Sequence, residues 1–80
     1  MNIHFTSNAF KVYNNLPSGY KNLLDKTLDK LKNKIPIDIK PLKGETDVYR
    51  IRFGKYRVLL NKIETDYLVF RIDTRGDIYK

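Results

Sequence analysis

The strongest hydrophobic pattern in the chain is a helical one, between residues 20 and 34. Apolar side chains recur there at steps of three and four residues, and with Thr27 they form one stripe of a helix: Tyr20, Leu23, Leu24, Leu28 and Leu31. Charge pairs on the other side are favourable at some positions and unfavourable at others, so burial of the stripe has to stabilise the helix. We expect the helix to end before Ile35, because a residue that precedes proline avoids helical dihedrals.

The first 19 residues predict a short strand followed by a short helix. Residues 3–6 alternate between apolar and polar side chains, as a half-buried strand does. Ser7 or Asn8 can cap the helix that follows, which is broken at residues 16–19. Pro17 can occupy the first turn of the longer helix, where its missing N–H is no loss.

In the second half of the chain the hydrophobic period changes to two. Alternation and a wealth of β-branched and aromatic residues predict three strands, over residues 48–53, 56–61 and 67–73. Gly54 and Lys55 form a two-residue turn with glycine first, which is compatible with a type II′ hairpin. A second turn is expected at residues 64–66.

Between these halves lies a segment that is predicted to be a loop. Residues 35–45 contain Pro36, Pro41 and Gly44, all of which interrupt regular structure. The predicted order is therefore β-α-α-β-β-β. It indicates an α+β fold in which two N-terminal helices pack on one face of a mainly antiparallel sheet, as a single domain over residues 1–80.

The charge balance indicates a polyanionic partner. The 80 residues include 16 Lys and Arg against 9 Asp and Glu, a formal net charge of +7. Such an excess favours nucleic acid, an acidic protein segment or an anionic membrane, although many small proteins are simply basic. The chain has no cysteine, which fits a reducing cytoplasm, and we expect neither a signal peptide nor a membrane span.

Most kinds of catalytic site lack their residues in this sequence. There is no glycine-rich phosphate loop, and His4 is the only histidine, so neither a histidine pair for zinc nor a base for Ser7 or Ser18 is available. The acidic pairs flank turns and are interpreted as solvated loop charges: Glu45 and Asp47, Glu64 and Asp66. No convergent set of carboxylates for a two-metal nuclease is evident.

What remains is a group of arginines and a tyrosine. Arg50 and Arg52 alternate on one predicted strand and Arg57 lies on its hairpin partner, so all three are expected on the sheet face opposite the helices. Like charges side by side on a sheet repel, and phosphate oxygens would relieve the repulsion through bidentate bonds. Any one of them could be an ordinary solvated residue, but the three together favour a phosphate site. Arg75 and Tyr79 could reach the same side, where the phenol could stack on a base or transfer a proton.

Three stretches of the chain resemble the RelE/ParE toxin superfamily. Residues 42–44 and 49–58 are similar to its "L-x-G … Y-R-I-R-x-G-x-Y-R-V" core, and residues 69–79 resemble its terminal "R-x-x-[IV]-Y". The resemblance implies a toxin of a type II toxin–antitoxin system. In its RelE-like form, it implies a cytoplasmic endoribonuclease that cuts mRNA in the ribosomal A site through attack of the RNA 2′-OH, with neither metal nor other cofactor and with a cognate antitoxin protein as partner.

The resemblance also implies roles for particular residues. Its basic and tyrosine positions correspond to a catalytic set made of Arg50, Arg52, Arg57, Arg75 and Tyr79. Further RNA-binding residues are predicted at Lys43, Lys55, Arg71 and Lys80. The paired positions of the first hairpin strand are lysines in the best-known RelE and arginines here, and a guanidinium stays protonated. Acid–base chemistry would then depend mainly on the tyrosine, with its pKa lowered by the arginines around it.

Two other functions remain open from the sequence. A ParE-type toxin shares the fold and poisons DNA gyrase without nuclease residues, and an inactive relative could bind RNA or titrate an antitoxin. The arginines and the terminal tyrosine favour the nuclease.

Overall fold

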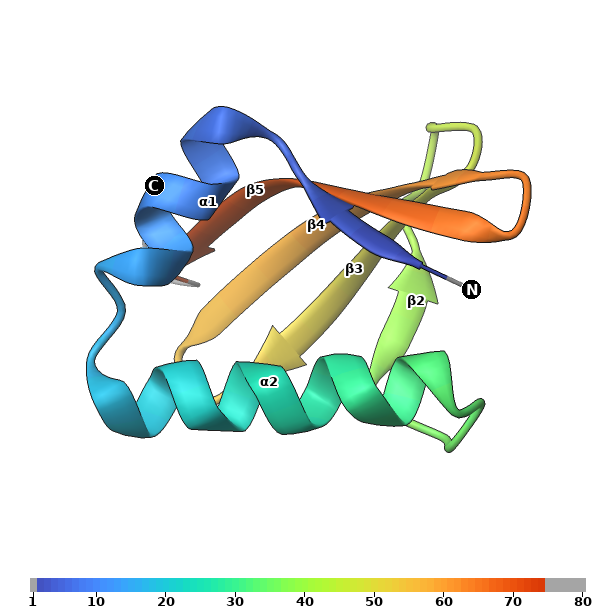
Figure 1. Ribbon diagram of the computed structural model, residues 1–80. Coiled ribbons are helices and arrows are strands. Elements are labelled where there is room, and N and C mark those ends of the chain that lie inside the picture. Colours follow the sequence, from blue (N-terminus) through green and yellow to red (C-terminus); the bar gives the residue numbers. More distant parts are fainter. Residues whose placement is uncertain (1, 75–80) are drawn as a thin grey trace.

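The computed structural model describes residues 2–74, which form one sheet with two helices on one of its faces (Figure 1). The elements in chain order are β1 (Ile3–Phe5), α1 (Ser7–Asn14), α2 (Ser18–Lys32), β2 (Ile39–Pro41), β3 (Val48–Phe53), β4 (Tyr56–Ile63) and β5 (Asp66–Thr74). Within the described residues the sheet has five strands in the order β1-β5-β4-β3-β2. Only β1 is parallel to its neighbour, and the other pairs are antiparallel. The predicted α+β fold is confirmed.

The core lies between the helices and the central strands. The helical stripe of α2 supplies Leu24, Leu28 and Leu31, all buried, and the sheet supplies side chains that point to the same side. The sheet residues of the core are Ile51, Phe53, Val58, Leu60, Tyr67, Val69 and Ile72. Helix α1 packs on β5 and α2 packs on β3, so the two helices cover opposite halves of one sheet face (Figure 1).

Both helices begin earlier than the sequence pattern indicates. Thr6 caps α1, since its hydroxyl oxygen accepts the N–H of Ala9 at 3.2 Å; the prediction of Ser7 or Asn8 was wrong. Helix α2 spans Ser18–Lys32 in place of residues 20–34, and Pro17 stands just before it, at the cap position. Apolar periodicity locates a buried face well, but it says little about polar first turns.

A tyrosine ties α1 to α2. The hydroxyl of Tyr13 donates a hydrogen bond of 2.5 Å to Oδ1 of Asp25, and Nζ of Lys21 lies 4.8 Å from the centre of the same ring. The carboxylate acceptor, more than burial, raises the pKa of Tyr13 to about 12. This link is polar and lies outside the core.

The segment predicted to be a loop contains a strand, β2, so the loop assignment for residues 35–45 was wrong in part. Ile39 pairs with Ile51, and Pro41 pairs with Tyr49 at the end of the strand. Since β2 is an edge strand, a proline there removes no hydrogen bond that the sheet needs. The proline and the nearby glycine are typical of loops, and for this reason the sequence pattern did not predict the strand.

The hairpin turns follow the predictions. Gly54 has φ of +57° and Lys55 is not among the residues with positive φ, as a type II′ turn requires. The second turn lies between β4 and β5, where Glu64 has φ of +56°. No helix in residues 2–74 is long and apolar enough to cross a membrane.

Candidate nucleic-acid interface

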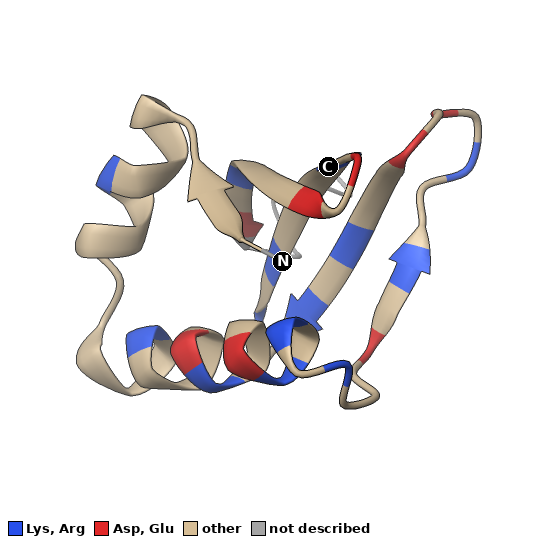
Figure 2. Cartoon of the chain, turned by 45° about the vertical axis from the view of Figure 1, so that its right-hand side comes forward, with Lys and Arg blue, Asp and Glu red and all other residues tan. Residues whose placement is uncertain are grey.

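Arg52 and Arg57 face each other across the β3–β4 hairpin. They are register partners, and the flanking pair of Ile51 and Val58 is fully buried in the core. Because alternate residues of a strand point to opposite faces, the two arginines project from the face opposite the helices. Arg52 is exposed and Arg57 is partly exposed, so both can be reached by a ligand. Figure 2 shows the basic positions of the sheet strands in blue.

Arg50 lies on the same face but is buried. The residue is 7% exposed, although a guanidinium carries five N–H donors that water would normally satisfy. Its Nη1 is buried and has no hydrogen-bond partner among residues 2–74, and its Nη2 lies 3.9 Å from Oδ1 of Asp38, beyond hydrogen-bond distance. The Asp38 side chain is half exposed, which weakens the attraction. The sequence pattern gave the correct face for Arg50 but not this burial.

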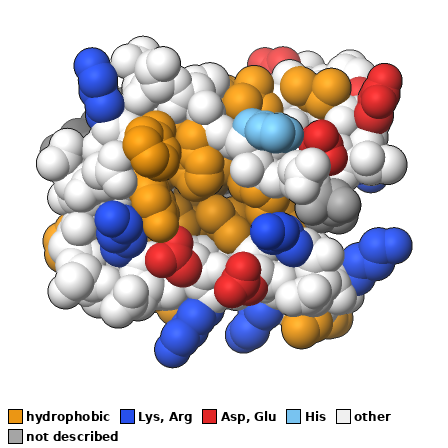
Figure 3. Space-filling view, viewed as in Figure 1, with side chains coloured by type: hydrophobic (Ala, Val, Ile, Leu, Met, Phe, Trp, Pro, Cys, Tyr) orange, Lys and Arg blue, Asp and Glu red, His pale blue; other side chains and the backbone are white. Residues whose placement is uncertain are grey.

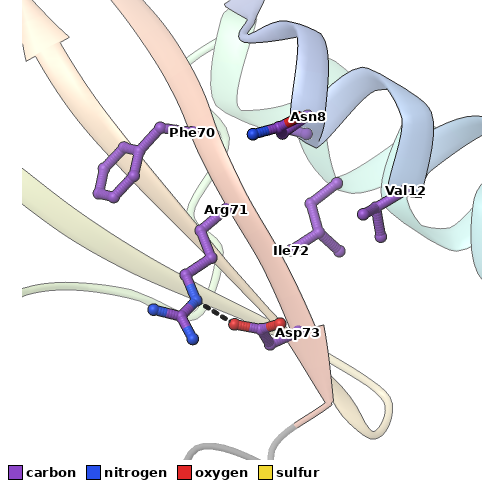
Figure 4. Close-up of a pocket in the computed structure, with 7 residues that line it drawn as sticks. Asn8, Val12, Phe70, Arg71, Ile72 and Asp73 are labelled. Atoms are coloured by element: carbon purple, nitrogen blue, oxygen red, sulfur yellow. Dashed lines mark hydrogen bonds and ion pairs between the residues drawn. The ribbon is translucent and has the colours of Figure 1, made fainter.

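A β-bulge adds two more side chains to this face. Leu59 pairs with Arg71 but the next residue, Leu60, pairs with Val69, so Phe70 is the extra residue of β5. Phe70 and Arg71 consequently project to the same side, away from α1 (Figure 4). Strict alternation along β5 would have separated them.

The arginine on β5 is already engaged. Nε of Arg71 donates to Oδ2 of Asp73, and both side chains line the pocket drawn in Figure 4. Arg71 is therefore on the face that holds Arg50, Arg52 and Arg57, but part of its charge is balanced within β5.

The remaining predicted residues are spread more widely. Lys43 is exposed in the connection between β2 and β3. Lys55 lies over the rings of Tyr20 and Tyr56, at 5.5 and 5.8 Å from their centres, and so turns toward the helix side of the sheet. Three predicted site residues lie outside the described part of the chain: Arg75, Tyr79 and Lys80.

Sequence reasoning did not place three further residues on or beside this face. Asp38 and Lys40 belong to the segment taken as a loop, and Phe70 is placed by the bulge. Alternation of Ile37, Ile39 and Pro41 would have been the signal for β2, but prolines and glycine outweighed it. Among residues 2–74 no group of three His, Cys, Asp or Glu side chains is placed to hold a metal ion.

The helix-covered sheet with arginines on its open face has the features expected of the small RelE/ParE-type toxins that the sequence resembles. Comparisons with known proteins test this expectation. No family model matches the chain. A candidate toxin of Methanocaldococcus jannaschii, named RelE1, is 33% identical over 85 residues, which cover 99% of this chain and 94% of the relative. The chain belongs to the RelE family of toxins, the toxin components of toxin–antitoxin systems.

Solved structures show the same fold. The RelB–RelE antitoxin–toxin complex from Methanococcus jannaschii contains a chain with a TM-score of 0.82 and 24% identity, covering 95% of this chain and 94% of that one. The isolated E. coli RelE toxin has a TM-score of 0.78 and 25% identity, covering 96% and 88%. The intact E. coli RelBE toxin–antitoxin complex also matches, with a TM-score of 0.78 and 24% identity over 90% and 93%.

Proposed function

We propose that this toxin is an endoribonuclease that cuts mRNA on the ribosome, in the cytoplasm, through attack of the RNA 2′-OH and without a metal ion. The 2′-oxygen forms a bond to the adjacent phosphorus, the bond from phosphorus to the 5′-oxygen breaks, one proton leaves the 2′-OH and one is gained by the 5′-oxygen. Negative charge builds on the phosphate oxygens as the bonds change. Fixed cations that face those oxygens lower the barrier, because they need no reorganisation at the moment of reaction.

The observation that supports this proposal is the Arg52–Arg57 register pair on the open sheet face, beside the buried Arg50. Guanidinium groups on adjacent strands repel one another, and a phosphate bound by both would relieve the repulsion. Nη1 of Arg50 is buried and has no hydrogen-bond acceptor among residues 2–74, and a phosphate oxygen that reached it could accept from it. The face thus offers positive charge and a donor on Arg50 to the oxygens of a pentacovalent phosphate.

Proton transfer needs a different residue. A guanidinium stays protonated at all physiological pH values, so the arginines can stabilise charge but cannot act as a base. We assign proton transfer to Tyr79, which resembles the terminal tyrosine of the family. Arg75 is its nearest arginine in the sequence and would favour the phenolate.

The partners follow from the same assignment. We propose that a cognate antitoxin protein binds this chain, since the related toxins of Methanococcus jannaschii and E. coli were solved as complexes with RelB. A net charge of +7 favours an acidic segment in that partner. On the ribosome the same charge favours contact with the phosphates of RNA.

The test is cleavage of mRNA on purified ribosomes stalled with an empty A site, followed by primer extension. Wild-type toxin should yield a discrete 5′ end inside the A-site codon, and Arg57→Ala should lower the rate at least about a hundredfold, as loss of a preorganised donor does. Lys26→Ala, on the exposed side of α2, is the control and should cleave like the wild type. Intact mRNA with wild-type toxin, together with a DNA-damage response on expression, would favour a gyrase poison instead.

A further inference from the structure

The edge strand β2 adds a lysine to the face that carries the arginines. Lys40 is the register partner of Arg50, while the preceding Ile39 pairs with the buried Ile51 on the core side. Lys40 therefore projects from the open face. It is exposed, and within residues 2–74 it has no ion pair. An ammonium and a guanidinium on adjacent strands start about 5 Å apart at their backbones, so they repel unless an anion separates them.

The charged residues of this face form two neighbouring rows across the strands. In one row an aspartate stands at each end: the N–H of Arg52 donates to the carbonyl of Asp38 at 3.3 Å, and Arg57 is the register partner of Asp73. The Asp38 carboxylate lies between the two rows, with Oδ1 3.9 Å from Nη2 of Arg50. The other row has a positively charged residue at each end and contains Lys40, Arg50, Leu59 and Arg71. A polyanion held at the arginine pair meets a negative charge in either direction along the first row.

The second row is not symmetric. At its β5 end the guanidinium of Arg71 is bound to Asp73, so part of its charge is already balanced. At its β2 end Lys40 carries an uncompensated charge at the edge of the sheet, where no further strand follows among the described residues. The favourable exit for a chain of phosphates is therefore over β2.

We propose that Lys40 binds the phosphate next to the scissile one, so that the RNA backbone leaves the active site across β2. This inference rests on the proposed nuclease function, because it needs RNA as the occupant of the arginine face. The role of Lys40 is binding and not chemistry, since it lies one strand outward from Arg50 and two from Arg57.

The experiment combines a protein variant with an RNA variant. Ribosome-bound mRNAs are prepared with natural linkages, or with one uncharged methylphosphonate linkage immediately 5′ or immediately 3′ of the scissile phosphate. Single-turnover cleavage is measured against toxin concentration for wild type, Lys40→Ala and the control Lys26→Ala. Lys40→Ala should raise the half-saturating concentration several-fold with little change in maximal rate, and should lower the salt slope of binding by about 0.7, the value for one phosphate of a single strand.

The decisive result comes from testing Lys40→Ala on the RNAs that carry a methylphosphonate linkage. With the methylphosphonate on one of the two sides, Lys40→Ala should cause no further loss, because the charge that it binds has already been removed. On each of the three RNAs, the control Lys26→Ala should cleave like the wild-type toxin. The inference is overturned if Lys40→Ala equals wild type, or if its defect persists undiminished with both uncharged linkages. If wild-type toxin leaves natural mRNA intact, the nuclease proposal fails first and the inference fails with it.

Discussion

Replacing Arg50 by methionine should make the protein more stable and inactive. Methionine keeps a flexible apolar stem of similar length but removes a guanidinium that is 7% exposed. One donor, Nη1, is buried without a hydrogen-bond partner in the part of the chain that the structure describes, and an unsatisfied donor of this kind costs about 1–3 kcal/mol. The cross-strand neighbour Lys40 adds a repulsion of roughly 0.2–1 kcal/mol.

The opposing term is the attraction to Asp38. At 3.9 Å and an effective dielectric constant near 20, two unit charges attract by about 4 kcal/mol, but the half-exposed Asp38 moves the value toward the 1 kcal/mol of bulk water. Desolvation of the guanidinium costs several kcal/mol, and the attraction between Arg50 and Asp38 does not offset this cost. The net expectation for Arg50→Met is a gain of about 1 kcal/mol in the free energy of unfolding, or about 4–8 °C in Tm for a domain of this size.

The assay is urea and thermal unfolding followed by circular dichroism, alongside mRNA cleavage on ribosomes. Arg71→Met is the matched control, since the Arg71 side chain is 62% exposed, and it should change stability by less than about 0.5 kcal/mol. A loss of more than about 1 kcal/mol in Arg50→Met would refute the reasoning, because the guanidinium would then serve folding and not the ligand. Wild-type cleavage by a stable Arg50→Met would remove Arg50 from the site.

Three further predictions concern the turn, the helix contact and the terminal tyrosine. Gly54→Ala should lower the unfolding free energy by about 1–3 kcal/mol in urea titrations, since Gly54 has φ of +57° and a Cβ there would lie 2.8 Å from Tyr20; Gly19→Ala, whose Cβ meets nothing within 4 Å, should instead raise it by about 0.5–1 kcal/mol. The folded-state pKa of Tyr13 is raised from 10.0 to about 12, so its bond to Asp25 stabilises the fold below pH 10, and this contribution is lost as the pH rises through 12. Ultraviolet titration should show that Asp25→Asn shifts one tyrosine back toward pH 10, and an unchanged titration would contradict the assigned bond. Tyr79→Phe should cleave ribosome-bound mRNA at least about a hundredfold more slowly than wild type, and an equal rate would exclude the tyrosine from proton transfer.

Periodicity in the sequence predicted most of the fold, because each long element buries one clear face. The α2 stripe and the three later strands alternate with the period of their structure, and the arginine face follows from counting by two. Alternation along the sequence mispredicts side-chain direction or strand position where the backbone is irregular. The bulge beside Leu59 re-aims Phe70, and Pro41 disguises β2 as a loop.

The site was predicted less completely than the fold, for a related reason. Which residues share a face is a local property, but burial depends on what other segments cover. Asp38 approaches Arg50 only because β2 pairs with β3, so neither the burial of the guanidinium nor the adjacent lysine is visible along the chain. Pairing of the first strand with the last is also nonlocal, and alternation within β1 carries no information on its partner.

That last pairing has a consequence for synthesis of the toxin. Ile3 of β1 aligns with Tyr67 of β5, and the N–H of Thr6 donates to the carbonyl of Val69 at 2.9 Å. A nascent chain that ends before β5 leaves its N-terminal strand unpaired and α1 without the surface on which it packs. Contacts between residues so distant in sequence form slowly, because bringing the two ends of the intervening chain together costs conformational entropy. The arginine face therefore stands on a complete sheet only after the ribosome has synthesised β5.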